Sequence, residues 1–129
     1  MTSYGFIGAG NMAGAIVRGA VGAGISPASI LLTSAHDSAR ALAAETGAEH
    51  LPDSVGLVSR LGADDVLVLA VKPQVLPGVV EEIAPVLTES AGRAPLVLSI
   101  AAGLGLERLA ALLPAGTRVV RAMPNMAAG

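Results

Sequence analysis

The chain has 129 residues, of which 53% are hydrophobic and 14% charged, and a formal net charge of −2; this suits one domain with a buried core and excludes a disordered chain. Its eight Lys and Arg residues are scattered and its aromatic content is 2%, so no nucleic-acid partner is expected. The absence of cysteine excludes disulfides, thiolate metal sites and cysteine nucleophiles.

Apolar runs alternate with helical patterns along the chain. The apolar runs predict six strands, over Tyr4–Ile7, Ile30–Thr33, Glu49–Leu51, Val66–Val71, Leu96–Ile100 and Arg118–Ala122. The patterns between them predict five helices, over Asn11–Ala23, Ser38–Glu45, Val55–Leu61, Gln74–Leu87 and Leu106–Leu113. Asp37 or Ser38 is expected to cap the second helix, and Asp53 or Ser54 the third.

This alternation predicts an α/β fold in which right-handed crossovers connect parallel strands. We expect a doubly wound parallel sheet of the Rossmann type, with six strands in the order 3-2-1-4-5-6, in a single dinucleotide-binding domain over residues 1–129. The apolar runs are too short to span a bilayer, and no basic and then apolar leader precedes the first strand. A cytoplasmic protein with no membrane partner is therefore expected.

The most informative motif is the glycine-rich loop directly after the first strand. It reads Gly8-Ala9-Gly10-Asn11-Met12-Ala13 and opens the first helix. A strand, a glycine turn and a helix in this order form the dinucleotide-binding fingerprint. Gly8 suits the tight turn, Gly10 leaves room for the pyrophosphate, and the helix N-terminus attracts phosphate. Ala13 is small enough for close packing of the helix, and the alternative is a glycine turn that is merely structural.

The end of the second strand bears on the choice between the two nicotinamide dinucleotides. NAD-binding proteins place an Asp or Glu there, about 20 residues after the glycines. This chain has Thr33-Ser34-Ala35-His36 instead. The hydroxyls of Thr33 and Ser34 can bond a 2′-phosphate, which favours NADP(H), while NAD stays possible. The alternative for this segment is a polar turn in which Ser34 and Asp37 satisfy backbone groups.

Ligands of an open parallel sheet bind beyond the carboxyl ends of its strands, so the loops there are expected to share one crevice. Besides the glycine loop, they are Lys72-Pro73-Gln74, Ala101-Ala102-Gly103 and Met123-Pro124-Asn125. Lys72 lies at the expected switch point, and its alternative role is that of a solvated cation. The sequence contains no Ser/His/Asp set, no His pair at metal-ligand spacing and no paired carboxylates at this edge. Neither a catalytic side chain nor a metal is therefore expected.

Taken in chain order, the motifs are Phe6–Ala13, Ala70–Gln74, Ser99–Gly103 and Val120–Asn125. Their sequence and spacing resemble the N-terminal domain of the pyrroline-5-carboxylate reductases. The resemblance implies an NAD(P)H-dependent reduction of the C=N bond of 1-pyrroline-5-carboxylate to L-proline. It implies that the cofactor is held by Gly8–Ala13, by Ala70, Val71, Lys72 and Pro73, and by Ala101, Ala102 and Gly103, with Met123, Pro124 and Asn125 beside the nicotinamide.

The chain departs from this family at three points. Met126-Ala127 stand where the family usually has Thr-Pro, and an arginine that the family often carries near Ser34 is absent. The family also has an all-helical C-terminal domain that forms its homo-oligomer and most of its substrate pocket. We therefore expect this chain to bind NADP(H) but to be inactive alone. The alternatives are a stand-alone dinucleotide-binding or interaction module without catalysis, and the N-terminal domain of a related NADP- or deazaflavin-dependent reductase.

Overall fold

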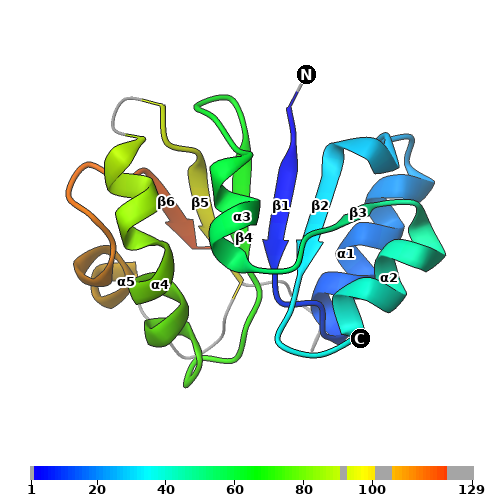
Figure 1. Cartoon of the computed structure of the whole chain (residues 1–129), viewed down its shortest axis with the longest axis horizontal. Helices are drawn as coiled ribbons and strands as arrows, with labels where there is room; N and C mark the ends of the chain where they lie inside the picture. The colour runs from blue at the N-terminus through cyan, green and yellow to red at the C-terminus, as the bar shows by residue number, and fades with distance from the viewer. Residues whose placement is uncertain (1, 91–92, 101–105, 122–129) are drawn as a thin grey trace.

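The computed structural model describes residues 2–90, 93–100 and 106–121, in which strands and helices alternate (Figure 1). The strands are β1 (Tyr4–Ile7), β2 (Ile30–Thr33), β3 (Glu49–His50), β4 (Val66–Leu69), β5 (Leu96–Ser99) and β6 (Val119–Arg121). The helices are α1 (Asn11–Gly22), α2 (Ser38–Thr46), α3 (Ser54–Ser59), α4 (Leu76–Glu89) and α5 (Leu106–Leu112), and a short 3₁₀ turn, η1 (Pro27–Ser29), precedes β2.

The six strands form one parallel sheet in the order β3-β2-β1-β4-β5-β6, which confirms the predicted Rossmann topology. β1 lies at the centre, where Phe6 stands opposite Leu32 on one side and Val68 on the other. The order reverses between β1 and β4, so this is the switch point of the sheet. All carboxyl ends of the strands lie along the lower edge in Figure 1, where the loop from β1 to α1 also lies.

The core is divided between the two faces of the sheet, because successive strand residues point to opposite sides. Ile7, Leu67 and Leu69 pack with the buried residues of α3, α4 and α5. Phe6 and Val68 pack with the buried residues of α1 and α2. The helices that connect β1 to β2 and β2 to β3 therefore cover one face, and those that follow β3, β4 and β5 cover the other.

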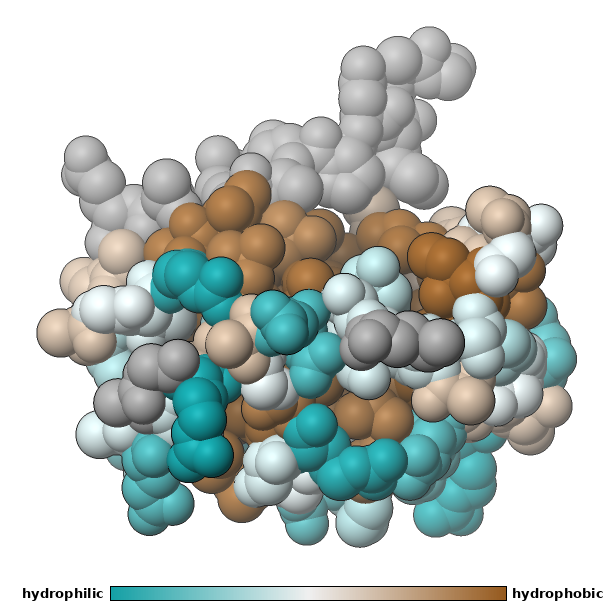
Figure 2. All heavy atoms as spheres, turned by 90° about the horizontal axis from the view of Figure 1, so that it is seen from above, coloured by the Kyte–Doolittle hydropathy of each residue, from teal (hydrophilic) through white to brown (hydrophobic). Residues whose placement is uncertain are grey.

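Part of the sheet on the α1 side is open. Tyr4, Phe6 and Ile30, with residues of β4, β5, α1 and the following loop, line an apolar hollow of about 340 Å³. Val120 on β6 is 46% exposed. Seen from above in Figure 2, hydrophobic residues gather toward the upper side of the view, while the lower side is mainly hydrophilic. Within the part of the chain that the structure describes, no helix has the length and hydrophobicity of a membrane span.

Several element boundaries differ from the predicted ones. β4 ends at Leu69 rather than Val71, where the Ala70 amide donates a last bond of 2.8 Å to the Ile7 carbonyl and the chain turns away from the sheet. α4 begins two residues later than expected, because the Lys72 carbonyl accepts bonds from the amides of Val75 and Leu76 and so closes a separate turn. The predicted end of the last strand at residue 122 lies outside the described residues.

The two expected helix caps have different outcomes. Asp53 caps α3, since its carboxylate accepts a 2.6 Å bond from the Gly56 amide. Asp37 occupies the N-cap position of α2 but makes no capping bond with its side chain. The Ser34 hydroxyl accepts a bond from the Ala39 amide instead, at 3.0 Å. The cap of α2 thus comes from the preceding turn, which satisfies an amide of the first helical turn in the same way.

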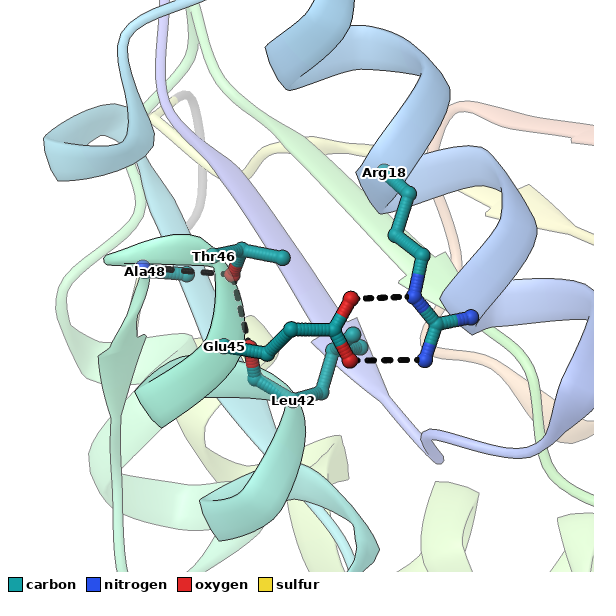
Figure 3. A network of polar contacts seen from close by, with 5 residues as sticks. All are labelled: Arg18, Leu42, Glu45, Thr46 and Ala48. Carbon is teal, nitrogen blue, oxygen red and sulfur yellow. Dashed lines mark hydrogen bonds and ion pairs between the residues drawn. The ribbon is translucent and has the colours of Figure 1, made fainter.

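An ion pair joins α1 to α2 on the surface (Figure 3). The Arg18 guanidinium donates two bonds to the Glu45 carboxylate, at 2.6 and 3.0 Å. This pairing lowers the pKa of Glu45 and raises that of Arg18, chiefly through the hydrogen bond itself. Both side chains are about half exposed, so solvent weakens the contribution of the pair to stability.

Candidate functional site

Gly8 lies where the carboxyl ends of three strands meet. Its amide donates a 2.8 Å bond to the Thr33 carbonyl at the end of β2, and its φ is +101°. A Cβ built on Gly8 would lie 2.7 Å from the carbonyl oxygen of Ala70 and 2.9 Å from the amide nitrogen of Val71. Both the backbone angle and the crowding therefore require glycine at this turn.

Gly10, two residues later, has open space around it among the described residues. It is exposed, and a Cβ built on it would meet no heavy atom of these residues within 4 Å. It is the N-cap of α1 and offers no side chain to the first amides of the helix. The first turn of α1 also contains no acidic residue. These amides and the positive end of the helix dipole are thus available to an anion that approaches over Gly10.

The rest of the glycine loop has two different environments. Asn11 is exposed, whereas Ala9 and Met12 are half-buried against the apolar cluster between α1, α2 and the sheet. Ala13 is 1% exposed and belongs to that cluster. Its small size brings α1 close to the sheet, as the glycine fingerprint requires of this position.

A cavity of about 510 Å³ opens beside Gly8, at the switch point of the sheet. This volume lies within the range of small-molecule sites. The cavity is lined from four segments of the chain that are far apart in sequence. They are Ile7 and Gly8 at the end of β1, Thr33–Ala35 at the end of β2, Pro52–Ser54 at the start of α3, and Val71, Val75, Gly78, Val79 and Glu82 from the loop after β4 and from α4.

Thr33 and Ser34, the residues expected to meet the 2′-position of the ribose, both line this cavity. Thr33 is 2% exposed, and its hydroxyl has no hydrogen-bond partner among the described residues. The Ser34 hydroxyl donates a 2.6 Å bond to the His36 carbonyl and accepts one from the Ala39 amide. Ser34 therefore behaves as the polar-turn alternative predicts, while Thr33 presents an unpaired buried donor to the cavity.

The loop after β4 supplies the other predicted residues of this edge. Ala70 and Pro73 are half-buried, and Val71 lines the cavity. Lys72 is exposed, and its ammonium group forms no hydrogen bond or ion pair with the residues that the structure describes. It does not line the cavity, and its carbonyl holds the turn into α4. The structure thus brings Gly8, Thr33, Ser34 and Val71 together and leaves Lys72 at the margin.

Two predicted segments, Ala101-Ala102-Gly103 and Met123-Pro124-Asn125, lie outside the described residues. Other lining residues were not predicted from the sequence, among them Asp53, Glu82 and further residues of α4 and of the loop before α3. Asp53 was predicted only as a helix cap. The signal for Asp53 was present, because its loop follows β3 and so belongs to the same carboxyl edge of the sheet.

The arrangement can hold a ligand with an anionic centre and an apolar or ribose-like end. The open backbone at Gly10 suits the anion, and the cavity beside Gly8 suits the other part. Among the described residues, no group of three or more His, Asp or Glu side chains could hold a metal ion.

One family model matches most of the chain. Residues 3–103 match the model of the family described as NADP oxidoreductase coenzyme F420-dependent. A pyrroline-5-carboxylate reductase of Methanosarcina acetivorans is 40% identical over 126 residues, which are 96% of this chain and 44% of that protein. Pyrroline-5-carboxylate reductase 3 of Macaca fascicularis is 40% identical over 127 residues, covering 95% of this chain and 42% of the relative. The chain thus spans less than half the length of these curated relatives.

Solved structures agree with the sequence matches. A pyrroline-5-carboxylate reductase from Coxiella burnetii has a TM-score of 0.84 at 34% identity, over 96% of this chain and 44% of that one. A pyrroline carboxylate reductase of Plasmodium falciparum with NADP bound has a TM-score of 0.78 at 25% identity, over 96% and 42%. A prephenate dehydrogenase from A. aeolicus, at 19% identity and a TM-score of 0.73, shares the fold. The resemblance predicted from the four motifs is confirmed.

Proposed function

This chain belongs to the family described as NADP oxidoreductase coenzyme F420-dependent, and from that premise we propose that it is the cofactor-binding domain of a pyrroline-5-carboxylate reductase. The domain would comprise residues 1–129 and bind NADP(H). The observation that carries the proposal is the pair of glycines after β1. Gly8 is enclosed at the switch point, and Gly10 leaves room for an anion to approach the first amides of α1. The curated relatives, at about 40% identity across nearly the whole chain, support the choice of reductase.

The residues present fit a dinucleotide. A pyrophosphate over Gly10 would meet the first amides of α1, where a Cβ would otherwise fill the space. The adenosine end would enter the cavity beside Gly8, where the unpaired Thr33 hydroxyl can bond a ribose oxygen. The remaining predicted contacts, at Ala101–Gly103 and Met123–Asn125, belong to this proposal on the strength of the motifs.

The bound cofactor would supply the hydride that reduces the C=N bond of 1-pyrroline-5-carboxylate to give L-proline. The part of this chain is to bind and orient the dinucleotide. Gly8 fixes the turn between the ends of β1, β2 and β4, so the loop and α1 keep one position relative to the cavity. Such positioning contributes to rate by holding the reactants in a productive geometry.

A domain exchange tests the reductase part of the proposal. The matched part of this chain, which is 96% of its length, would replace the corresponding segment of the Methanosarcina acetivorans relative, and NADPH oxidation with 1-pyrroline-5-carboxylate would be measured. We expect the exchanged protein to reduce this substrate and its Gly10→Ala version to lose most of that activity. An exchanged protein that folds and binds NADPH, yet leaves 1-pyrroline-5-carboxylate unreduced, would contradict the assignment.

Two further properties stay predictions. Assembly into a homo-oligomer is implied by the family resemblance, and sedimentation of the exchanged protein would test it. We also propose a cytoplasmic location, which fractionation of the source cells would test. The small-molecule substrate itself is tested by the exchange experiment.

A further inference from the structure

Two carboxylates lie on the wall of the cavity beside Gly8. Asp53 reaches it from the loop before α3, and Glu82 from α4. Thr33, with its buried and unpaired hydroxyl, lines the same cavity. If the proposed function holds, this wall meets the adenosine ribose, and the inference below rests on that placement.

The geometry of Asp53 leaves its charge partly free. One carboxylate oxygen, Oδ1, accepts the 2.6 Å bond from the Gly56 amide. The other oxygen has no hydrogen-bond partner among the described residues. A ribose 2′-hydroxyl can donate a hydrogen bond to such an oxygen, as it does to the acidic residue after the second strand in NAD-binding proteins. A 2′-phosphate cannot donate in this way and carries a charge of the same sign.

Among the described residues that line the cavity, none is a Lys, Arg or His that could offset the two carboxylates. The cations that directly follow lining residues in sequence are His36 and Lys72, and both are exposed and do not line the cavity. A 2′-phosphate inside the cavity would therefore face net negative charge, and it would find a cation only by pointing out of it.

We propose that Asp53 is a specificity-determining residue of the dinucleotide site, which weakens the binding of NADPH relative to NADH and so allows the chain to accept both. Its loop supplies, from the end of β3, the acidic group that NAD-binding proteins usually carry at the end of β2. The end of β2 carries no acidic residue, yet the cavity contains the carboxylate of Asp53. The proposed role of Asp53 accounts for both observations. Thr33 would complete the recognition of the ribose from β2 itself.

Asp53→Asn tests this with little risk to the fold, because Asn caps helices about as well as Asp. Dissociation constants for NADPH and NADH would be measured by fluorescence titration, and those for 2′,5′-ADP and ADP by calorimetry. We expect the substitution to improve binding of the 2′-phosphorylated ligand of each pair about fivefold relative to the other ligand. The change should shrink at high salt, because both charges are partly solvated.

Glu81→Gln is the matched control, since Glu81 is an exposed carboxylate on α4 that does not line this cavity. This substitution should leave unchanged the ratio of the NADPH and NADH dissociation constants and that of the 2′,5′-ADP and ADP dissociation constants. Unchanged ratios in Asp53→Asn, with thermal unfolding like that of the parent, would overturn the role of Asp53. Failure of the parent chain to bind any of the four ligands would instead refute the proposed function, so the two failures are distinguishable.

Discussion

Gly8 and Gly10 stand two residues apart in one loop, yet they need glycine for different reasons. Gly8 has a positive φ and would place a Cβ 2.7 Å from the Ala70 carbonyl oxygen. Gly10 has an ordinary φ of −75°, and a Cβ there would contact none of the described residues. Gly8 is therefore required by the fold itself, whereas no described residue requires glycine at Gly10 and a bound ligand would.

Alanine at each position separates these roles. Gly8→Ala should destabilise the chain by about 2 kcal/mol or more, through strain at positive φ and the contact with the end of β4. Gly10→Ala should unfold like the parent chain but bind NADPH at least about tenfold more weakly, because its Cβ occupies the approach to the α1 amides. Urea unfolding and NADPH titration measure the two effects. Equal NADPH affinity in Gly10→Ala and parent would contradict the site.

Thr33 carries a buried hydroxyl for which the described fold offers no partner. An unsatisfied buried polar group costs about 1–3 kcal/mol. Thr33→Val should therefore raise the free energy of unfolding by about 1 kcal/mol and weaken dinucleotide binding about fivefold, through loss of a ribose bond. Urea unfolding measures the change in the free energy of unfolding, and titration with NADH measures the change in binding.

Thr46→Val is the control for this prediction. The Thr46 hydroxyl donates a 2.7 Å bond to the Leu42 carbonyl (Figure 3), so its loss should lower stability and leave binding unchanged. A loss of stability in Thr33→Val, combined with unchanged binding, would show that the hydroxyl is satisfied within the fold and has no ligand to meet.

At the scale of elements, the ion pair between α1 and α2 should show itself in the pH dependence of stability. The bond from Arg18 lowers the pKa of Glu45 below its ordinary value of 4.5. A lowered carboxyl pKa means that the pair stabilises the fold fully above pH 4.5 and loses this contribution as the pH falls through the lowered value. Glu45→Gln should thus have a slightly lower melting temperature than the parent at pH 7 and a smaller difference from the parent at pH 3.

Glu81→Gln provides the comparison for this effect, because Glu81 has no ion-pair partner among the described residues. Its melting temperature should follow that of the parent at both values of pH. A difference between Glu45→Gln and the parent that is as large at pH 3 as at pH 7, after correction for this control, would mean that the helices are joined by packing at this position rather than by charge.

The elements also show what the sequence can and cannot predict. The strand order followed from the alternation of apolar runs and helical patterns, because crossovers of one hand leave few topologies. The predicted capping residue of α2 was wrong, since the side chain of Ser34 rather than that of Asp37 accepts the hydrogen bond from the Ala39 amide. Local sequence offers both side chains, and only the path of the turn after β2 decides between them. Asp53 was missed as a site residue because its approach to β2 depends on how β3 and α3 pack.

At the scale of the whole molecule, the cavity is a property of the complete fold. Its lining comes from segments before and after the switch point, between Ile7 and Glu82, and they meet only when both halves of the sheet are in place. A ligand of this cavity should therefore bind the folded chain and not the unfolded one. Binding of this kind stabilises a fold by about 2.7 kcal/mol when the free ligand is at a hundred times its dissociation constant.

NADPH at that concentration should accordingly raise the melting temperature of the chain by roughly 10 °C. The Gly10→Ala variant should start from the parent's melting temperature and show a much smaller rise at the same NADPH concentration, since its fold is intact and its anion site is blocked. Differential scanning calorimetry with and without NADPH measures both shifts. An equal rise in the two proteins would mean that NADPH binds away from the α1 terminus, and no rise in the parent would mean that the cavity does not take this ligand.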